Sequence, residues 1–440
     1  MIKKTAGAEG ELNVANRTLF ICDNVGVLDG MNSECADLIY LDPPFNSNRH
    51  YSAPIDSRAA GAAFKDAWTL DDIDLAWVGQ IAERHPGLAA VINAAGLAGG
   101  KGDKAYLIFM ARRVLEMHRI LKATGSIYLH CDPTMSHSLK MLMDSVFGKR
   151  QFRNEVIWSY NRFSRRGGAF PSMSDTILFY GKGRGALFNK LPVAARDATR
   201  YEKGYHTVVD DGVKRLLVYD RKKAADKIAA AKKEGTAVAH TKSQSPSVGN
   251  VWGDIPIINP MAKERTGYPT QKPLALLERI IRASSDEGGV VLDPFCGCAT
   301  ALVAAERLNR RWIGVDISPK ATDLIQTRLQ NAQDMLTTKG AWKKVSTRRD
   351  RPARTDGGDL MVNPKEYRHE LYGMQNGECA GCRHEFPFRN MTVDHKDADA
   401  PARTRNAKTN LQLLCGACNS VKGPRPMSYL LAYLKKHGIV

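Results

Sequence analysis

The stretch Gly288–Ser318 reads GGVVLDPFCGCATALVAAERLNRRWIGVDIS and predicts a strand, a tight turn, a helix and a second strand. The first strand ends on Asp293, before the turn Pro294–Cys298, and the second ends on Asp316, 23 residues further on. Gly297 permits close approach of the backbone, and the helix N-terminus can accept an anionic group. A carboxylate after the second strand can accept hydrogen bonds from ribose hydroxyls. The pattern is typical of nucleotide-binding α/β folds, although it also fits a plain strand, turn and helix with a capping Asp.

Strands and helices alternate on both sides of this stretch. Apolar runs predict strands over residues 18–22, 36–41, 126–131, 289–293 and 312–316. Apolar spacings of three and four residues predict helices over residues 104–122, 274–283, 299–308 and 319–337. Such alternation forms a parallel sheet covered on both faces, so we expect an α/β fold. The Ala/Gly-rich residues 53–103 predict an insertion with one helix.

The composition of the 440 residues excludes several classes of protein. A hydrophobic share of 43% is typical of a globular protein, and the length suggests about two to four domains. No stretch approaches the ~18 consecutive apolar residues of a membrane span. The N-terminal region lacks the apolar core and cleavage site of a signal peptide. We therefore expect a cytoplasmic protein without a membrane segment.

The net charge of +18 is concentrated in two blocks. Residues 151–250 carry 19 Lys and Arg against 9 Asp and Glu, and residues 339–440 carry 19 against 10, which gives +10 and +9. The other 238 residues sum to −1. Because Lys and Arg near phosphates release condensed counterions, these blocks favour an extended polyanion as partner. Solvated helix faces are the alternative.

The motif Asp42-Pro43-Pro44-Phe45 directly follows an apolar strand. Methylation of the exocyclic amine of a nucleobase requires hydrogen-bond acceptors, because the lone pair of that nitrogen is delocalised into the ring. The Asp42 carboxylate and the Pro43 carbonyl can accept the two amine hydrogens, while Pro44 stiffens the loop and Phe45 stacks on an extruded base. Alternatively, a lone Asp-Pro-Pro sequence is often only a turn without a catalytic role.

Five blocks of the chain resemble, in order, the DNA amino-methyltransferases of the β order, in which the catalytic motif precedes target recognition and the cofactor motif comes last. The resemblance covers about residues 17–335, with the blocks LIYLDPPFNS, LIFMARRVLEMHRILKATGSIYLHCDPT, FGKRQFRNEVIWSY, TGYPTQKPLALLERII and VVLDPFCGCATALVAAERLNRRWIGVDIS. It implies a Rossmann-like methyltransferase that depends on S-adenosyl-L-methionine (AdoMet). The catalytic half would lie at 1–150, the target-recognition region at 151–250 and the AdoMet-binding half at 251–338.

The resemblance also implies roles for individual residues. Asp42, Pro43, Pro44 and Phe45 would surround the target amine. This is taken as the 6-amino group of adenine, because a motif that begins with Asp is more typical of adenine than of cytosine methylation. AdoMet would be held by Asp23, Thr270, Gln271, Lys272, Pro273, Asp293, Pro294, Phe295, Cys296, Gly297, Thr300 and Asp316, with residues 270–273 near its methionine moiety. Ala299 stands where many relatives have a second Gly, which is tolerable unless that position needs a positive φ.

Two CxxC pairs lie in a module at 366–440 that follows a basic linker at 339–365. The pairs are Cys379 with Cys382 and Cys415 with Cys418, and 32 residues separate them. Four thiolates at this spacing predict a structural zinc site, which would supply much of the folding free energy of so small a module. The other five Cys are scattered, so a reducing compartment fits the chain better than a disulfide framework.

The segments TVDHKDAD and TNLQLLCGACNSVKG inside this module resemble the HNH nucleases, whose ββα-metal core combines an Asp-His pair, a middle Asn and a final His or Asn. By position, Asp394 and Asn419 would bind magnesium or manganese. His395 would activate water as general base, and Asn410 would brace the loop. This chain has Asn at the third position, which is a variant of the family pattern. The alternative is a zinc-stapled module that only binds DNA.

Together the resemblances predict a bifunctional, restriction-modification-like enzyme, bacterial or phage-encoded. It would methylate double-stranded DNA and cleave it with its C-terminal endonuclease module. Both a monomer and a homodimer are compatible with the sequence. Two other interpretations stay open: a methyltransferase whose C-terminal module only anchors it on DNA, and a non-catalytic nucleic-acid binder that keeps AdoMet as a sensor.

Overall fold

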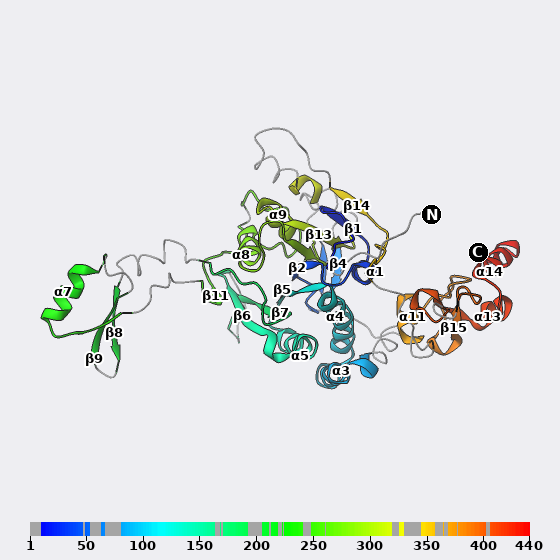
Figure 1. Cartoon of the computed structure of the whole chain (residues 1–440), viewed down its shortest axis with the longest axis horizontal. Coiled ribbons are helices and arrows are strands. Elements are labelled where there is room, and N and C mark those ends of the chain that lie inside the picture. The colour runs from blue at the N-terminus through cyan, green and yellow to red at the C-terminus, as the bar shows by residue number, and fades with distance from the viewer. Residues whose placement is uncertain are drawn as a thin grey trace. The chain divides into compact units, whose positions relative to one another are not determined.

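Figure 1 shows the computed structural model of the chain. It describes residues 10–46, 49–52, 63–66, 81–162, 168, 170–191, 205–210, 213–218, 222, 224–240, 248–259, 261–318, 325–329, 345–356, 364, 368–375, 377–401 and 405–440. The chain divides into two compact units, one formed by Phe188–Trp252 and a larger one formed by the rest. Within the described ranges, no helix has the length and apolar character that crossing a membrane requires.

The main sheet of the larger unit has a parallel centre. In hydrogen-bonded order, this part consists of β5 (Leu121–Cys131), β2 (Ala36–Leu41), β12 (Val290–Asp293), β13 (Arg311–Asp316), β1 (Thr18–Ile21) and β14 (Ser346–Arg348). Beyond β5 the sheet continues antiparallel with β7 (Ser174–Gly181) and β6 (Phe152–Ser159). The α/β class and the five predicted strands are confirmed. The antiparallel edge is a difference, because β6 and β7 come from the segment that the sequence assigned to target recognition.

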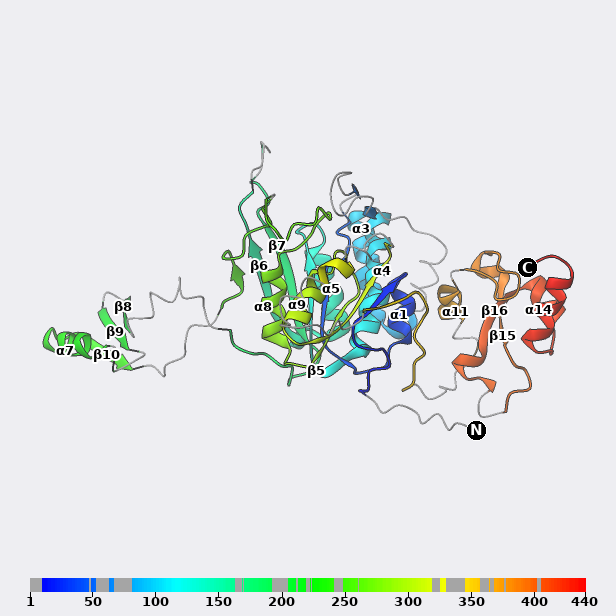
Figure 2. The same ribbon diagram turned by 90° about the horizontal axis from the view of Figure 1, so that it is seen from above.

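Helices cover both faces of this sheet (Figure 2). One group consists of α1 (Asn24–Gly30), α3 (Pro86–Gly99), α4 (Lys101–Ile120) and α5 (Ser136–Phe147), and the other of α8 (Leu274–Ser284) and α9 (Thr300–Arg307). Because strand side chains alternate between faces, Ile39 and Leu41 join the core under the first group. On the opposite face, Tyr128 hydrogen-bonds Ser284 of α8, and Trp312 donates to Glu306 of α9.

Element boundaries differ from the prediction at β5. The sequence predicts a turn at residues 123–125 and a strand from 126, whereas β5 begins at Leu121. Leu121 pairs with Ala36 of β2, and the register then shifts before Ser126 pairs with Leu38. A strand irregularity of this kind leaves no mark in apolar periodicity. Of the predicted helix at 319–337, only residues 325–329 lie within the described residues, and these are helical.

The smaller unit, Phe188–Trp252, lies within the predicted target-recognition region. It contains the hairpin of β8 (Tyr205–Asp210) and β9 (Val213–Val218), then α7 (Ala225–Lys233) and β10 (Ala237–His240), which pairs parallel to β9. Leu216, Val218, Ala224 and Ala231 form its core. The strand β11 (Val251–Trp252) ends the unit in sequence. This unit begins at residue 188, inside the predicted target-recognition region 151–250, and the aromatic residues Trp158, Phe179 and Tyr180 are buried in the larger unit.

The C-terminal module has its own small core. It consists of α11 (Arg368–Met374), the antiparallel pair β15 (Met391–His395) and β16 (Leu411–Cys415), α13 (Gly416–Lys422) and α14 (Met427–Lys436). The order β15, β16 and α13 gives the ββα arrangement that the sequence predicts. The remaining short elements are the antiparallel pair β3 (Arg49–Ser52) and β4 (Ala63–Asp66) and the 3-10 turns Lys149–Gln151, Phe388–Asn390 and Lys408–Asn410.

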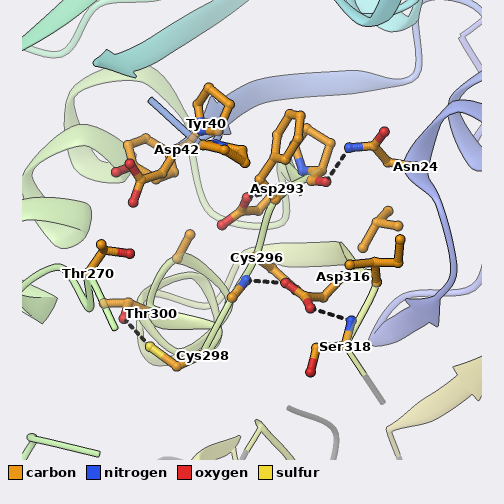
Figure 3. Close-up of a pocket in the computed structure, with 18 of the residues that line it drawn as sticks. Asn24, Tyr40, Asp42, Thr270, Asp293, Cys296, Cys298, Thr300, Asp316 and Ser318 are labelled. Atoms are coloured by element: carbon orange, nitrogen blue, oxygen red, sulfur yellow. Dashed lines mark hydrogen bonds between the residues drawn. The ribbon is translucent and has the colours of Figure 1, made fainter. Parts of the chain in front are cut away.

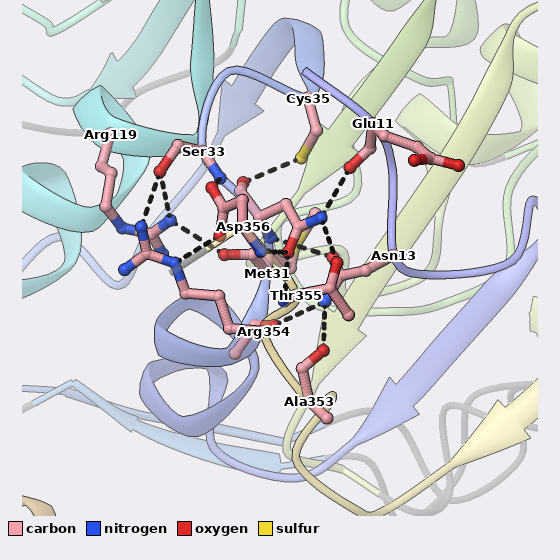
Figure 4. A network of polar contacts seen from close by, with 12 residues as sticks. Glu11, Asn13, Met31, Ser33, Cys35, Arg119, Ala353, Arg354, Thr355 and Asp356 are labelled. Carbon is pink, nitrogen blue, oxygen red and sulfur yellow. Dashed lines mark hydrogen bonds and ion pairs between the residues drawn. The ribbon is translucent and has the colours of Figure 1, made fainter. Parts of the chain in front are cut away.

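Part of the predicted basic linker is built into the larger unit (Figure 4). After β14, residues 353–356 lie against the loop that follows α1. The fully buried Asn32 donates from Nδ2 to Thr355 Oγ1 (2.7 Å) and accepts the Thr355 N–H at Oδ1 (2.8 Å). Asp356 accepts the Ser33 N–H and pairs with Arg354 at 2.7 Å. The larger unit therefore extends past the boundary predicted at residue 338.

The substitution Asn32→Ala removes both hydrogen bonds to Thr355, whereas the contacts of Asn13 with Ala353 and of Ser33 with Asp356 remain. We expect the free energy of unfolding of the larger unit to fall by about 1–2 kcal/mol, measured by urea denaturation. The control Asn93→Ala lies on an exposed surface of α3 and should change it by less than about 0.5 kcal/mol. Equal stabilities of the two variants would show that these hydrogen bonds do not hold the segment in place.

Candidate active site

A cavity of about 460 Å³ opens at the carboxyl ends of the parallel strands. Asp42 follows β2, Asp293 ends β12, Asp316 ends β13 and Asp23 follows β1, and all four residues line it (Figure 3 shows the first three). The cavity brings together every catalytic and cofactor residue that the sequence predicts in the first 338 positions except Pro273, which is the N-cap of α8. Parallel pairing is the reason, because the carboxyl ends of parallel strands meet at one edge of a sheet.

One carboxylate oxygen of Asp42 is hydrogen-bonded, and the other has no partner among the described residues. Its Oδ2 lies 2.5 Å from Nζ of Lys272, which is 7% exposed. Its Oδ1 is buried and, among the described residues, finds no hydrogen-bond donor. Lys272 also lies 5.1 Å from the centroid of the Phe45 ring. An unpaired buried acceptor costs about 1–3 kcal/mol, so Oδ1 indicates a donor that arrives with a ligand. The sequence places Lys272 near a cofactor, whereas the structure pairs it with Asp42.

The turn after β12 is fixed by hydrogen bonds to carboxylates (Figure 3). The backbone N–H groups of Gly297 and Ser318 each donate to Asp316 at 2.8 Å. Burial raises the pKa of Asp316 to about 6, and these two donors oppose the rise. Burial also raises the pKa of Asp293 well above its usual range, although the Phe295 N–H opposes this. Glycine is favoured at position 297, because its φ is +51° and a Cβ would lie 3.2 Å from the Tyr268 ring.

Three non-glycine residues at or beside the cavity have left-handed backbone. Their φ angles are 58° at Asn46, 60° at Thr270 and 62° at Ala299. Such angles cost of order 1 kcal/mol or more each and persist where the surroundings impose them, which is typical of functional sites. The backbone of Ala299 therefore has a positive φ. From the sequence, a positive φ is the condition under which an Ala in place of the second Gly of many relatives would matter.

Asp23 has partners that the sequence does not reveal. Its Oδ1 accepts the Val25 N–H and caps α1, while its Oδ2 pairs with the buried Arg113 at 2.9 Å. Arg113 also donates to Asn24 Oδ1 (2.6 Å), and Asn24 donates to the Pro294 carbonyl (2.7 Å). Burial lowers the pKa of Arg113 to about 10, so the guanidinium stays charged. One buried Arg thus links the ends of β1 and β12.

Several residues that line the cavity were not anticipated from the sequence, among them Tyr40, Tyr268, Asn24 and Arg113. For two of them, the sequence contains a feature from which their place at the cavity could have been predicted. Tyr40 lies two positions before Asp42 and so shares its face of β2. Arg113 interrupts the apolar pattern of α4, and a charged residue on a buried face needs a partner.

Four cysteines of the C-terminal module converge. Cys379, Cys382, Cys415 and Cys418 are buried, and their Sγ atoms all lie within 4.8 Å of one another. The N–H of Gly381 and that of Cys415 point at Cys379 Sγ, at 3.4 and 3.3 Å. Four soft thiolate ligands this close together could hold a zinc ion, the metal that the CxxC spacing predicts.

The predicted nuclease residues are arranged differently from the expectation. His395 Nε2 lies 2.9 Å from Asn406 Oδ1, which only accepts, so Nε2 is the donor in this contact. Asp394 accepts from Nζ of the fully buried Lys422 at 3.1–3.2 Å and from Gln412 at 2.9 Å. Lys422 thus places a positive charge at the carboxylate that was predicted to bind a divalent cation. Asn410 donates to the carbonyls of Asp397 and Arg405 and so braces the loop as predicted.

Two family profiles match the chain. Residues 36–327 match the DNA methylase family, and residues 355–436 match the family described as recombination endonuclease VII. The first match includes strands β2, β5, β12 and β13 and the cavity residues from Tyr40 to Asp316. The second includes the cysteine cluster and the Asp394-His395 pair.

Individual relatives and solved structures are also similar to the chain. The chain is 28% identical to the type II methyltransferase M.EcaI of Enterobacter cloacae over 67% of this chain and 64% of that protein, so it spans just under two thirds of that relative. It is 24% identical to the DNA adenine methyltransferase YhdJ of Escherichia coli over 72% and 83%. Among solved structures, a DNA modification methylase of Thermus thermophilus in complex with S-adenosyl-L-methionine is 20% identical over 72% and 95%, with a TM-score of 0.38.

The cysteine cluster predicts one zinc ion per chain, measured by elemental mass spectrometry of the purified protein. Cys415→Ser should lose the ion and unfold the C-terminal module, because the metal supplies much of its folding free energy. Cys22→Ser, outside the cluster, is the matched control and should keep it. A wild-type chain that folds with four free thiols in the module and no metal would contradict the assignment.

Proposed function

Since this chain belongs to the DNA methylase family, we propose that its larger unit transfers a methyl group from AdoMet to the exocyclic 6-amino group of adenine in double-stranded DNA. The observation that carries the proposal is the unpartnered Oδ1 of Asp42, a buried acceptor in the cavity beside the stacking candidate Phe45. Adenine is proposed rather than cytosine because the motif begins with Asp, and the E. coli relative is by name an adenine methyltransferase.

The chemistry follows from what the amine needs. Asp42 Oδ1 and the Pro43 carbonyl accept its two hydrogens, which draws the nitrogen lone pair out of conjugation with the ring. Lys272 holds the other Asp42 oxygen, so the carboxylate is fixed before the base arrives. AdoMet, when bound, supplies an electrophilic methyl group. On transfer of that methyl group, the amine nitrogen would lose one proton through its hydrogen bond to Asp42, and the carboxylate would accept it.

The cavity suits the proposed cofactor. Its volume of about 460 Å³ lies within the range of about 300–1,000 Å³ found for ligand sites. Asp316 has oxygen lone pairs left for ribose hydroxyls besides its two backbone donors. The carboxylates at its wall, Asp42, Asp293 and Asp316, also suit a ligand that carries a positive sulfonium.

The smaller unit is the proposed DNA-recognition element. Residues 188–252 carry 13 Lys and Arg against 7 Asp and Glu, which leaves a net charge of +6. A basic surface of this kind supplies phosphate contacts that position the protein on a duplex.

A second candidate function is cleavage of phosphodiester bonds by the C-terminal module. It is favoured by the match to the recombination endonuclease VII family and by the His395 ring, which contacts Asn406 through Nε2 and not through Nδ1. The Lys422 ammonium at Asp394 argues for the alternative, a zinc-stapled module that only binds DNA. A divalent ion at Asp394 would compete with the Lys422 ammonium, which contacts both oxygens of that carboxylate.

Asp42→Asn tests the methyl transfer. The amide replaces an acceptor by a group that also donates, and it leaves Lys272 without its carboxylate. We expect transfer of labelled methyl groups to duplex DNA to fall by about 100-fold or more, the usual effect of removing one such group. Asp350→Asn, an exposed residue outside the cavity, should transfer at the wild-type rate. Retained activity in Asp42→Asn would refute the role of the carboxylate.

The pKa of Asp316 predicts how AdoMet binding depends on pH. Burial raises this pKa to about 6, so the carboxylate is charged at pH 8 and protonated below pH 6. Protonation removes the acceptor for the ribose hydroxyls, so affinity should be constant above about pH 7 and fall as the pH drops through 6. Isothermal titration calorimetry measures this, and Asp316→Asn should bind weakly with no such drop. An identical pH profile in that variant would contradict the assignment.

His395→Ala tests the second function. With magnesium or manganese, the wild type should nick supercoiled plasmid, and the variant should not, while both methylate DNA equally. Absence of nicking by the wild type with either ion would leave DNA binding as the role of the module. Its binding would then weaken steeply as the salt concentration rises.

A further inference from the structure

A buried lysine lies against the carboxylate that the sequence predicts as a metal ligand in the C-terminal module. Lys422 is the last residue of α13 and is fully buried. Its Nζ lies 3.2 Å from Oδ1 and 3.1 Å from Oδ2 of Asp394, whose side chain is 12% exposed. A charge removed from water needs a partner, and here the ammonium and the carboxylate provide it for each other.

A second donor reaches the same carboxylate from the neighbouring strand. Gln412 of β16 lies opposite Asp394 of β15 in the antiparallel pair, and its Nε2 donates to Oδ2 at 2.9 Å. Gln412 is 3% exposed, and the same nitrogen lies 3.3 Å from Sδ of Met427. Asp394 is therefore held from both α13 and β16.

The helix that carries Lys422 also carries part of the cysteine cluster. Cys415 caps the start of α13, and its Sγ accepts the N–H of Cys418 at 3.5 Å. Both thiols belong to the cluster, and Asn419, the other predicted ligand of the divalent ion, lies on the next turn of the helix. The cluster and the ammonium are thus positioned by one short helix.

The predicted ligands suit a divalent ion by type but not by charge. A carboxylate and an amide both offer the oxygen atoms that magnesium and manganese prefer. Asp394 supplies the negative charge of this pair, because the Asn419 amide is neutral, and Lys422 balances that charge at about 3 Å. An ion at Asp394 would therefore meet a like charge on the same carboxylate, and burial strengthens their repulsion.

We propose that Lys422 is a built-in cation that sets a low affinity for divalent ions at Asp394, so that the C-terminal site takes up magnesium or manganese only at high concentrations. This inference rests on the second candidate function and adds the residue that governs its metal. An ion pair that only stabilises the module would leave the affinity for the ion unchanged when Lys422 is replaced.

The test measures manganese binding to the zinc-loaded full chain by electron paramagnetic resonance. Lys422→Met keeps most of the volume of the side chain and removes its charge. We expect this variant to bind manganese at least about tenfold more tightly than the wild type, because a like charge in contact with the ligand is removed. The added substitution Asp394→Asn should abolish the gain, which assigns the ion to this carboxylate.

Lys396→Met is the matched control, because it removes the same charge from the same module. Lys396 is exposed, lies two positions after Asp394 and donates from Nζ to the Thr409 carbonyl at 2.8 Å. Solvent and salt screen an exposed charge, so manganese affinity should stay within about twofold of the wild type.

Equal manganese affinity in the wild type and Lys422→Met overturns the proposal, as does an equal gain in Lys396→Met. If Lys422→Met fails to retain zinc, Lys422→Gln, which keeps a neutral donor for Asp394, replaces it in the same comparison. If neither the wild type nor the variant nicks plasmid while the gain in affinity holds, the second candidate function fails and the role of Lys422 stands.

Discussion

Parallel strand pairing forces four carboxylates to one edge of the sheet, and the rest of the site follows from how their charges are accommodated. Lys272 pairs with Asp42, and Arg113 pairs with Asp23. Backbone N–H groups hold Asp316, and burial keeps the pKa of Asp293 well above its usual range. Because each carboxylate has a different environment, each can have a different role. Asp42 offers an open acceptor, while Asp23 caps a helix. The proposed cationic cofactor adds the positive charge that this edge of the sheet favours.

The residues at this edge of the sheet can be predicted from the sequence, because each is marked by its immediate neighbours in the chain. An apolar strand that ends on Asp-Pro can be recognised without knowing its neighbours, and parallel topology then brings Asp42, Asp293 and Asp316 together. The partners of buried polar residues are harder to predict, because they lie far away in the chain. Arg113 pairs with a residue 90 positions earlier, and His130 contacts Asp175 across 45. Nothing near His130 in sequence shows whether it is packed only against apolar residues or hydrogen-bonds side chains of neighbouring strands.

Two segments show what the sequence alone leaves open. Trp158, Phe179 and Tyr180 lie in the segment assigned to target recognition, and β6 and β7 bury all three in the main sheet. The basic stretch after residue 339 suggests a linker, yet β14 continues the sheet beside β1, as charged residues often do at sheet edges. In the C-terminal module, the cysteine cluster agrees with its spacing, whereas Lys422 was not anticipated at Asp394, 28 positions before it.

The central claim is that the Asp42 cavity methylates the 6-amino group of adenine in DNA. Base-resolved sequencing of DNA from a host that expresses the chain, compared with the same host expressing Asp42→Asn, tests it most directly. We expect N6-methyladenine at one recurring sequence context in the first culture and none there in the second. Modified cytosine at that context, or no modified base in either culture, would contradict the claim.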